Sequence, residues 1–132
     1  MPDCKPVKGQ IWYPSEENVI FAHDRLIEQV GGWSGFEVGM APYATFLKEV
    51  KAARGIYRKG AVLMKSIATS RMFQDGHHRT AFVVTQDFLE YNGAEFKEKD
   101  LQKVSGFIKN IRTCSINEIA SWLEYGSKEK SK

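Results

Sequence analysis

The sequence predicts an all-α fold, a compact bundle of about six helices in a single domain. Apolar residues recur at helical spacing in several separate segments, and no segment alternates convincingly between apolar and polar residues as a half-buried strand does. Serines suited to helix starts and glycines suited to helix stops flank several of these segments. The chain has 132 residues, a length that fits one domain and can bury roughly two-thirds of its unfolded surface.

Three helices are predicted in the first half of the chain. Ser15 can cap the first of them, two acidic residues follow in its opening turn, and two glycines after residue 30 stop it. The apolar spacing then predicts helices at about 43–54 and 56–70, separated by a glycine.

The fourth predicted helix, at about 77–91, carries the strongest apolar signal. Its run Ala81–Val84 is apolar nearly all round, which is typical of a helix buried on every side. We therefore expect this helix at the centre of the bundle, with Phe82 and Leu89 almost completely buried.

Two further helices complete the predicted domain. A fifth helix is expected near 98–111, and Ser115 begins the capping-box pattern S-x-x-E that opens a sixth. We expect an N-terminal extension over 1–13, a single domain over 14–126 and a flexible basic tail over 127–132.

The glycine-rich loop at 31–42 connects the first two predicted helices and carries apolar anchors. Trp33, Phe36 and Met40 alternate with its four glycines, Met40 directly after the last of them. They can pin the loop onto the core or dock a partner protein, and the sequence leaves both readings open. A small hairpin can also form within this loop.

Composition excludes several classes of protein. No apolar run approaches ~18 residues, so we expect no membrane span and no membrane partner. The two cysteines form no C-x-x-C pair, and the start of the chain lacks the apolar stretch of a signal peptide, so we expect a cytoplasmic protein. The net charge is +3 and comes mostly from the lysine tail, which makes nucleic acid an unlikely partner.

The loop between the third and fourth helices carries the chemistry. Gly76 can adopt a positive φ there, and the helix that follows exposes backbone N–H groups at about 76–79. Those donors and the helix dipole form an anion site, to which Arg79 can add a bidentate contact to phosphate. Asp75 can hold a magnesium ion between phosphates.

Simpler explanations exist for each of these residues. Asp75 is also a good N-cap residue, and Arg79 can pair with a nearby carboxylate. His77 and His78 are adjacent, so on a helix they point in different directions and lack the usual spacing of a zinc site. His23 lies on the apolar stripe of the first helix and fits a core histidine.

At this loop the sequence resembles a known family. The stretch Phe73–Ala81, FQDGHHRTA, is similar to the Fic/Doc signature H-x-F-x-(D/E)-(G/A)-N-(G/K)-R and to the T-A that follows it in the Doc, or death-on-curing, branch. The segments PSEENVIFAHDRLIEQVGG and SINEIASWLEYG resemble the first and last helices of Doc. The resemblance spans about 14–126.

This resemblance implies a helical bundle around a phosphate-holding loop. Members of the family transfer part of a nucleoside triphosphate to a protein hydroxyl: Fic members usually transfer AMP, and Doc is a toxin of toxin–antitoxin pairs that phosphorylates a translation factor. It therefore implies ATP or another nucleotide and magnesium as cofactors, and as partners a protein target with an acceptor hydroxyl and an antitoxin. Asp75 matches the magnesium position, Phe73 the anchor, and Gly76 and Arg79 match phosphate-holding positions.

The departures from the signature bear on catalysis. Arg71 stands where the family has its general-base histidine, and arginine cannot give up its proton in a protein. Because a positioned base contributes typically ~10²–10⁴ in rate, we expect phosphate binding with impaired transfer. His77 and His78 stand at the asparagine and the glycine-or-lysine positions, where they can add to phosphate binding. Either of them can alternatively replace the base and keep the enzyme active. A third reading is a non-enzymatic interaction module.

Overall fold

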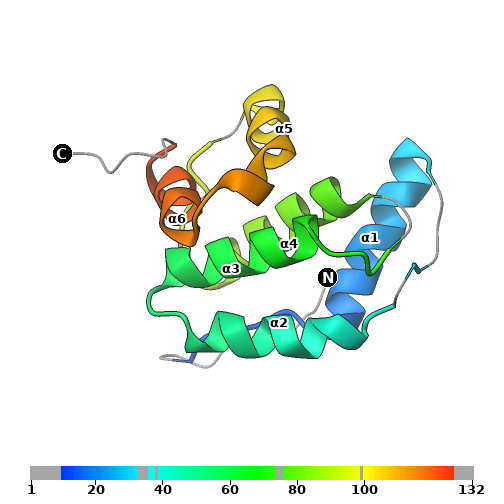
Figure 1. Ribbon diagram of the computed structural model, residues 1–132, viewed down its shortest axis with the longest axis horizontal. Helices are drawn as coiled ribbons and strands as arrows, with labels where there is room; N and C mark the ends of the chain where they lie inside the picture. Colours follow the sequence, from blue (N-terminus) through cyan, green and yellow to red (C-terminus); the bar gives the residue numbers. More distant parts are fainter. Residues whose placement is uncertain (1–9, 33–35, 38, 74–75, 99, 127–132) are drawn as a thin grey trace.

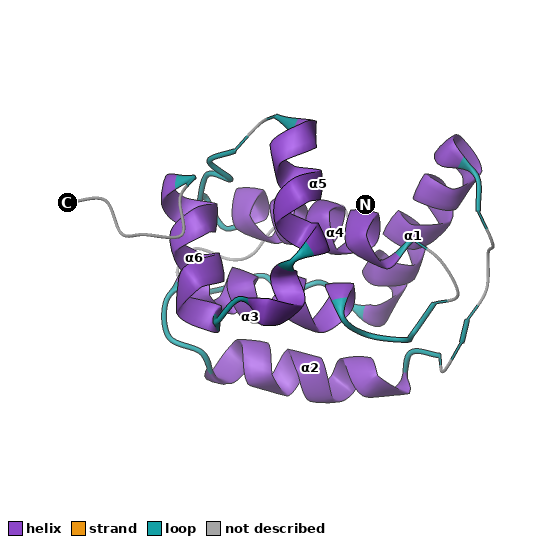
Figure 2. Ribbon diagram, turned by 45° about the horizontal axis from the view of Figure 1, so that its top comes forward, coloured by secondary structure: helices purple, strands orange, loops and turns teal. Residues whose placement is uncertain are grey.

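The computed structural model describes residues 10–32, 36–37, 39–73, 76–98 and 100–126. Within these ranges every named secondary-structure element is a helix, and loops connect the helices (Figure 1 and Figure 2). Six α-helices and one short 3-10 helix follow one another: α1 (Glu16–Val30), α2 (Ala41–Ala52), α3 (Ile56–Ala68), α4 (His77–Tyr91), α5 (Leu101–Lys109), η1 (Ile111–Thr113) and α6 (Ile116–Tyr125). The predicted all-α class is confirmed. No helix in the described ranges is both long and apolar enough to cross a bilayer.

Two helices, α3 and α4, form the centre of the bundle. They pack against each other, α3 also packs against α2 and α6, and α4 also packs against α1 and α5. Figure 1 shows α2 on one side of this pair, α5 and α6 on the other, and α1 at one end. The prediction that the fourth helix is central is confirmed, although α3 shares that place.

A glycine allows the close approach of three of these helices. A Cβ added to Gly60 of α3 would lie 3.3 Å from Cδ2 of Leu89 in α4 and 3.4 Å from Cδ1 of Leu123 in α6. Gly60 is near the start of α3 and Leu89 near the end of α4, so the two central helices run antiparallel.

The helix starts follow from local hydrogen bonds that the sequence encodes. The Ser15 side chain accepts from the Asn18 amide and the Asn18 side chain accepts from the Ser15 amide, which makes a capping box at α1. Ser115 and Glu118 make the predicted capping box at α6.

Two predicted helix ranges were displaced. The helix predicted at 43–54 runs over Ala41–Ala52, since Pro42 sits in its first turn, where a missing N–H costs nothing. The helix predicted at 98–111 is shorter, because the Asp100 side chain accepts from the Gln102 amide and fixes a later start.

Burial in α4 was predicted correctly at one end and wrongly in the middle. Leu89 is fully buried, as expected. Phe82 is only partly buried, because it borders an open groove between α4 and α5. The expectation of complete burial for Phe82 was therefore wrong, and the face of α4 that carries it is only partly covered.

The loop at 31–42 pairs with another loop, and its described residues form no hairpin with one another. Phe36 and Phe73 form a single antiparallel bridge, and the amides of Glu37 and Gly39 both donate to the Met72 carbonyl. The Phe36 and Phe73 rings stack with centroids 5.7 Å apart. Trp33 of the predicted anchors lies outside the described residues.

The described part of the predicted N-terminal extension is bonded to the bundle. The Trp12 amide donates to Oδ1 of Asn92, and Nδ2 of Asn92 donates back to the Trp12 carbonyl. The Tyr43 hydroxyl donates to the Pro14 carbonyl at 2.7 Å. These bonds attach the segment before α1 to α2 and to the end of α4.

Candidate functional site

Among the described residues no side chain caps the start of α4, whereas side chains cap α1, α5 and α6. The starts of α2 and α3 have no side-chain cap either. The N-cap residue of α4 is Gly76, with φ 82°, and the first turn contains no acidic residue. In helical geometry the amides of residues 77–79 have no acceptor within the helix. The positive end of the helix dipole is therefore uncompensated by any side chain of the helix itself.

These residues face a cleft of about 430 Å³. We name it the α4 cleft, and it is lined by Leu26, Ile27, Gly31, Gly76, His77, His78 and Arg79. The end of α1 supplies the apolar wall, and the first turn of α4 supplies the polar one. Arg79 is exposed, so its guanidinium can reach a ligand in the cleft. Gly76, His77, His78 and Arg79, which the sequence predicts as phosphate-binding residues, are thus brought together.

An aromatic stack supports the loop beneath the cleft. His23 of α1 is fully buried and stacks on Phe73 with ring centroids 3.8 Å apart and planes 6° apart. Its Nδ1 lies 3.2 Å from Oδ1 of Asp24. The histidine is a core residue, one of the readings that the sequence allowed.

The closeness of His23 and Ile27 restricts the residue at position 76. A Cβ at Gly76 would lie 3.4 Å from Cδ2 of His23 and 3.4 Å from Cδ1 of Ile27. Glycine is therefore favoured at position 76 both by its positive φ and by the closeness of α1. Sequence reasoning found the first cause and missed the second, since nothing in the sequence pairs His23 with this loop.

The two histidines of the site have different surroundings. His77 is half-buried, and its Nε2 has no contact with solvent and no hydrogen-bond partner among the described residues. The pKa of His78 is lowered by partial burial and, secondarily, by the neighbouring His77. His78 is therefore mostly neutral at pH 7, and its ring can either donate to an anion or accept a proton.

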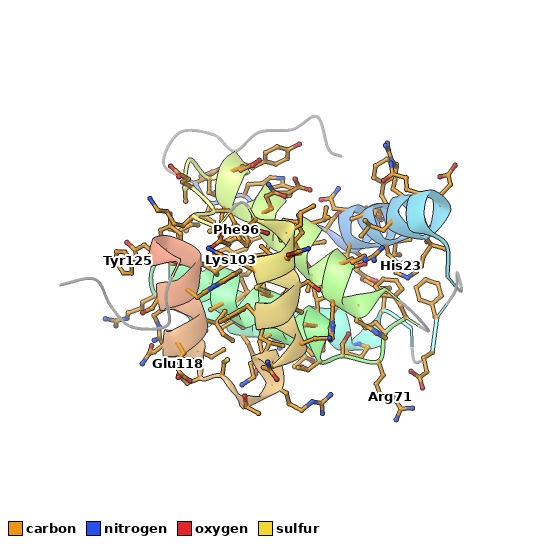
Figure 3. The ribbon with its side chains drawn as sticks, turned by 90° about the horizontal axis from the view of Figure 1, so that it is seen from above. His23, Arg71, Phe96, Lys103, Glu118 and Tyr125 are labelled. Atoms are coloured by element: carbon orange, nitrogen blue, oxygen red, sulfur yellow. The ribbon has the colours of Figure 1, made fainter. Side chains whose placement is uncertain are left out.

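Arg71, at the position that matches the family histidine, is not among the residues that line the α4 cleft. Its side chain is 74% exposed and forms an ion pair with Glu37. This bond lowers the pKa of Glu37 and raises that of Arg71. Figure 3 shows Arg71 projecting outward from the molecule, whereas His23 lies on α1. The guanidinium thus contacts the loop that follows α1.

Asp75, the predicted magnesium ligand, lies outside the described residues. Within the ranges that the structure describes, no group of three or more histidine, cysteine or acidic side chains is close enough to hold a metal ion. The magnesium assignment therefore stays a prediction that rests on the resemblance alone.

Helix α4 carries an unusual set of buried polar atoms. Four buried side-chain atoms among the described residues have no hydrogen-bond partner, and all four are on this helix: His77 Nε2, Thr80 Oγ1, Thr85 Oγ1 and Asp87 Oδ2. Burial raises the pKa of Asp87 to about 6, with a smaller contribution from Glu90. Unsatisfied buried polar groups are few in native proteins. Their concentration on α4, which borders the cleft, distinguishes α4 from the other helices of the described chain.

Comparison with known proteins adds no assignment. No protein-family model matches the chain, and no curated protein matches it.

Proposed function

We propose that this chain binds the phosphate groups of a nucleotide or of another phosphate ester in the α4 cleft. The observation that carries the proposal is the cleft at the uncapped, positive end of α4, with Arg79 on its rim. A helix start of this kind favours anions through its free amides and its dipole. The Fic/Doc-like signature of the same loop points to a nucleotide such as ATP.

Each part of the cleft suits a different part of the ligand. The amides of residues 77–79 can donate to phosphate oxygens, and Arg79 can add a bidentate, charge-assisted contact. His78 can donate a further hydrogen bond. Bound magnesium would neutralise charge between phosphates, with Asp75 as its proposed ligand.

We further propose that transfer of AMP or phosphate to a protein hydroxyl is weak or absent. In the family's mechanism, a histidine at the position that Arg71 occupies here takes the proton of the acceptor hydroxyl. Arg71 has donors and no acceptor, and its side chain pairs with Glu37. Loss of a positioned base corresponds to a ~10²–10⁴-fold lower rate.

A second candidate is an active transferase that uses His77 or His78 as the base. The observation that favours it is that both histidines line the cleft and that the lowered pKa of His78 leaves its imidazole neutral at pH 7. A neutral imidazole can accept a proton, which Arg71 cannot. A third candidate is an interaction module that binds a protein such as an antitoxin and no nucleotide.

Calorimetric titration of the full chain tests the binding proposal. ATP with magnesium, and inorganic phosphate alone, should bind the wild type, and Arg79→Ala should weaken both by about tenfold or more, as expected when a charged hydrogen bond is lost. Arg112→Ala, an exposed arginine of η1, is the matched control and should bind as the wild type does. Equal binding by Arg79→Ala and wild type would show that Arg79 is not part of the phosphate site. If the wild type binds neither ligand, the interaction module is the candidate function that is left.

Transfer of label from γ-labelled and α-labelled ATP separates the two enzymatic readings. We expect little incorporation into protein by the wild type. Robust incorporation that disappears in His77→Ala or His78→Ala would establish the second candidate. Incorporation that survives both substitutions would require a base outside the loop.

A further inference from the structure

A second hollow adjoins the α4 cleft. It has a volume of about 370 Å³ and lies between α4 and α5. We name it the α5 groove, and its lining consists of Leu26, His78, Arg79, Phe82, Val83, Leu101, Val104, Ser105 and Ile108. Three of these residues, Leu26, His78 and Arg79, also line the α4 cleft. The two hollows therefore meet at the side chains that border the anion site.

The α5 groove is apolar beyond this shared border. Among the described residues that line it, the only polar one past His78 and Arg79 is Ser105. Val104 and Ile108 are buried, whereas Leu101 is 67% exposed, the largest exposure among the large apolar side chains described. Phe82, expected in the core, is left partly open at the same place.

This lining selects against ligands that need many hydrogen bonds. Any donor or acceptor of a nucleobase edge that is buried in the groove would find one serine hydroxyl at most, so buried edge atoms would be left unsatisfied and weaken binding. An aliphatic chain carries no such groups and gains free energy in proportion to the apolar area that it removes from water. The apolar side chains of the groove would lose water at the same time.

We propose, on the basis of the phosphate binding proposed above, that the ligand is a phosphate monoester of an aliphatic alcohol. Its phosphate lies against the amides of residues 77–79 and Arg79. Its chain runs past His78 along the α5 groove, in contact with Phe82 and Leu101. The ligand is thus amphipathic. Its charged phosphate lies in the α4 cleft and its apolar chain lies in the α5 groove.

A series of alkyl phosphates tests the proposal by calorimetry on the full chain. Inorganic phosphate, ethyl, butyl and octyl phosphate are used below their aggregation concentrations, with AMP as the nucleobase comparator. We expect affinity to rise about two- to fourfold for each methylene that enters the groove, as full burial of a methylene implies. Octyltrimethylammonium, which has the same tail and the opposite charge, should not bind.

Variants locate the tail. Leu101→Ser alters an exposed residue, so the fold should survive, which a thermal melt verifies. It should reduce the gain from ethyl to octyl phosphate at least threefold and leave inorganic phosphate unchanged. Tyr125→Ser, an exposed aromatic residue at the end of α6, is the matched control and should leave the whole series unchanged. Arg79→Ala should weaken inorganic phosphate and every alkyl phosphate.

The outcomes separate this inference from the binding proposal. If all phosphates bind with the affinity of inorganic phosphate, the phosphate site stands and the inference about the tail is wrong. If AMP binds more tightly than octyl phosphate and Leu101→Ser weakens it, the groove holds a base and the inference is wrong. If octyl phosphate and octyltrimethylammonium bind equally, the groove takes apolar chains without the head contact, and the inference is again wrong. If no phosphate binds, both proposals fail.

Discussion

Helices α4 and α6 both pack against α3, yet their polar groups are arranged in opposite ways. α6 begins with the Ser115–Glu118 capping box, in which the Ser115 side chain accepts from the Glu118 amide and the Glu118 side chain accepts from the Ser115 amide. α4 begins at Gly76, with no capping side chain among the described residues and no acidic residue in its first turn. The four buried side-chain atoms that lack a partner in the described ranges lie on α4 and none on α6.

The difference indicates which helix is optimised for stability. A cap contributes about 1 kcal/mol, and a buried polar atom without a partner costs about 1–3 kcal/mol. α6 has the first feature and lacks the second, and α4 shows the reverse. α2 and α3 also start without a side-chain cap, so the argument rests on the buried polar atoms without a partner, which among the described residues lie on α4 alone. Local departures from stable design concentrate at functional sites, and these atoms support the proposal that α4 binds a ligand.

The largest effect is expected from placing a negative charge in the first turn of α4. His78→Glu should complement the helix dipole and raise the free energy of unfolding by about 0.3–1 kcal/mol. The same charge should repel phosphate and lower its affinity by tenfold or more. Thermal melts and phosphate titrations of the same samples measure both effects.

The control places the same charge at the same helical position elsewhere. Gln102 is the second residue of α5, whose start is already capped by Asp100. Gln102→Glu should leave phosphate affinity unchanged. If both variants lose affinity equally, net charge explains the loss and the contrast between helix starts does not.

The next effect concerns a buried hydroxyl of α4. Thr85 is fully buried and its Oγ1 has no partner. Thr85→Val keeps the shape and removes the unsatisfied group, so the free energy of unfolding should rise by about 1–2 kcal/mol in denaturant titration. Thr69→Val is the matched control: the Thr69 hydroxyl donates to the Lys65 carbonyl, and its loss should destabilise. Destabilisation by Thr85→Val would indicate that the hydroxyl has an unseen partner.

Removal of the α6 cap should have an effect of about 1 kcal/mol. Ser115→Ala deletes the acceptor of the Glu118 amide bond and should lower the free energy of unfolding by that amount. Phosphate affinity should not change, because α6 contributes no residue to the α4 cleft. A loss of phosphate binding in this variant, with the fold intact, would contradict the division between the two helices.

The smallest effect is a pH dependence from Asp87. Burial raises its pKa from 3.8 to about 6 in the folded chain, so the folded state binds the proton more tightly than the unfolded state. Stability therefore falls as pH rises from about 4 to about 6. The carboxyl is only half-buried, so after allowance for solvent screening we expect about 0.5–1 kcal/mol.

Asp87→Asn should abolish this dependence. The variant should exceed the wild type in stability at pH 7, and the gap should close near pH 4. Denaturant titrations at several pH values measure it, with Glu124→Gln, an exposed residue of α6, as the control that keeps the wild-type profile. If the difference in unfolding free energy between Asp87→Asn and the wild type is the same at all pH values, proton binding by Asp87 does not cause it.

The features that the sequence predicted well are local ones. Ser115 and its glutamate are three positions apart, so their capping box can be read directly from the chain. Gly76, by its place between two apolar segments, indicated the turn before α4. The apolar run at Ala81–Val84 correctly indicated a central helix, although Phe82 and Val83 within it are only partly buried.

The features that it missed depend on residues far apart in the chain. The stack of His23 on Phe73 joins α1 to the loop before α4. The ion pair that directs Arg71 outward involves Glu37. The open face at Phe82 follows from where α5 lies. Apolar spacing carries no information about such pairings, and the α5 groove could not be foreseen for the same reason.

The bonds between Asn92 and the segment before α1 have a consequence for the chemical ageing of the protein. An asparagine followed by glycine deamidates when the glycine amide nitrogen attacks the side-chain carbon. Here the Asn92 side chain is held by Trp12 and by the Phe88 carbonyl, and the Gly93 amide donates to Glu90. Deamidation should therefore be slow in the folded chain and rapid once it unfolds. Conversion to aspartate removes the donor to Trp12 and Phe88, so an aged sample should lose the attachment of its N-terminal segment first.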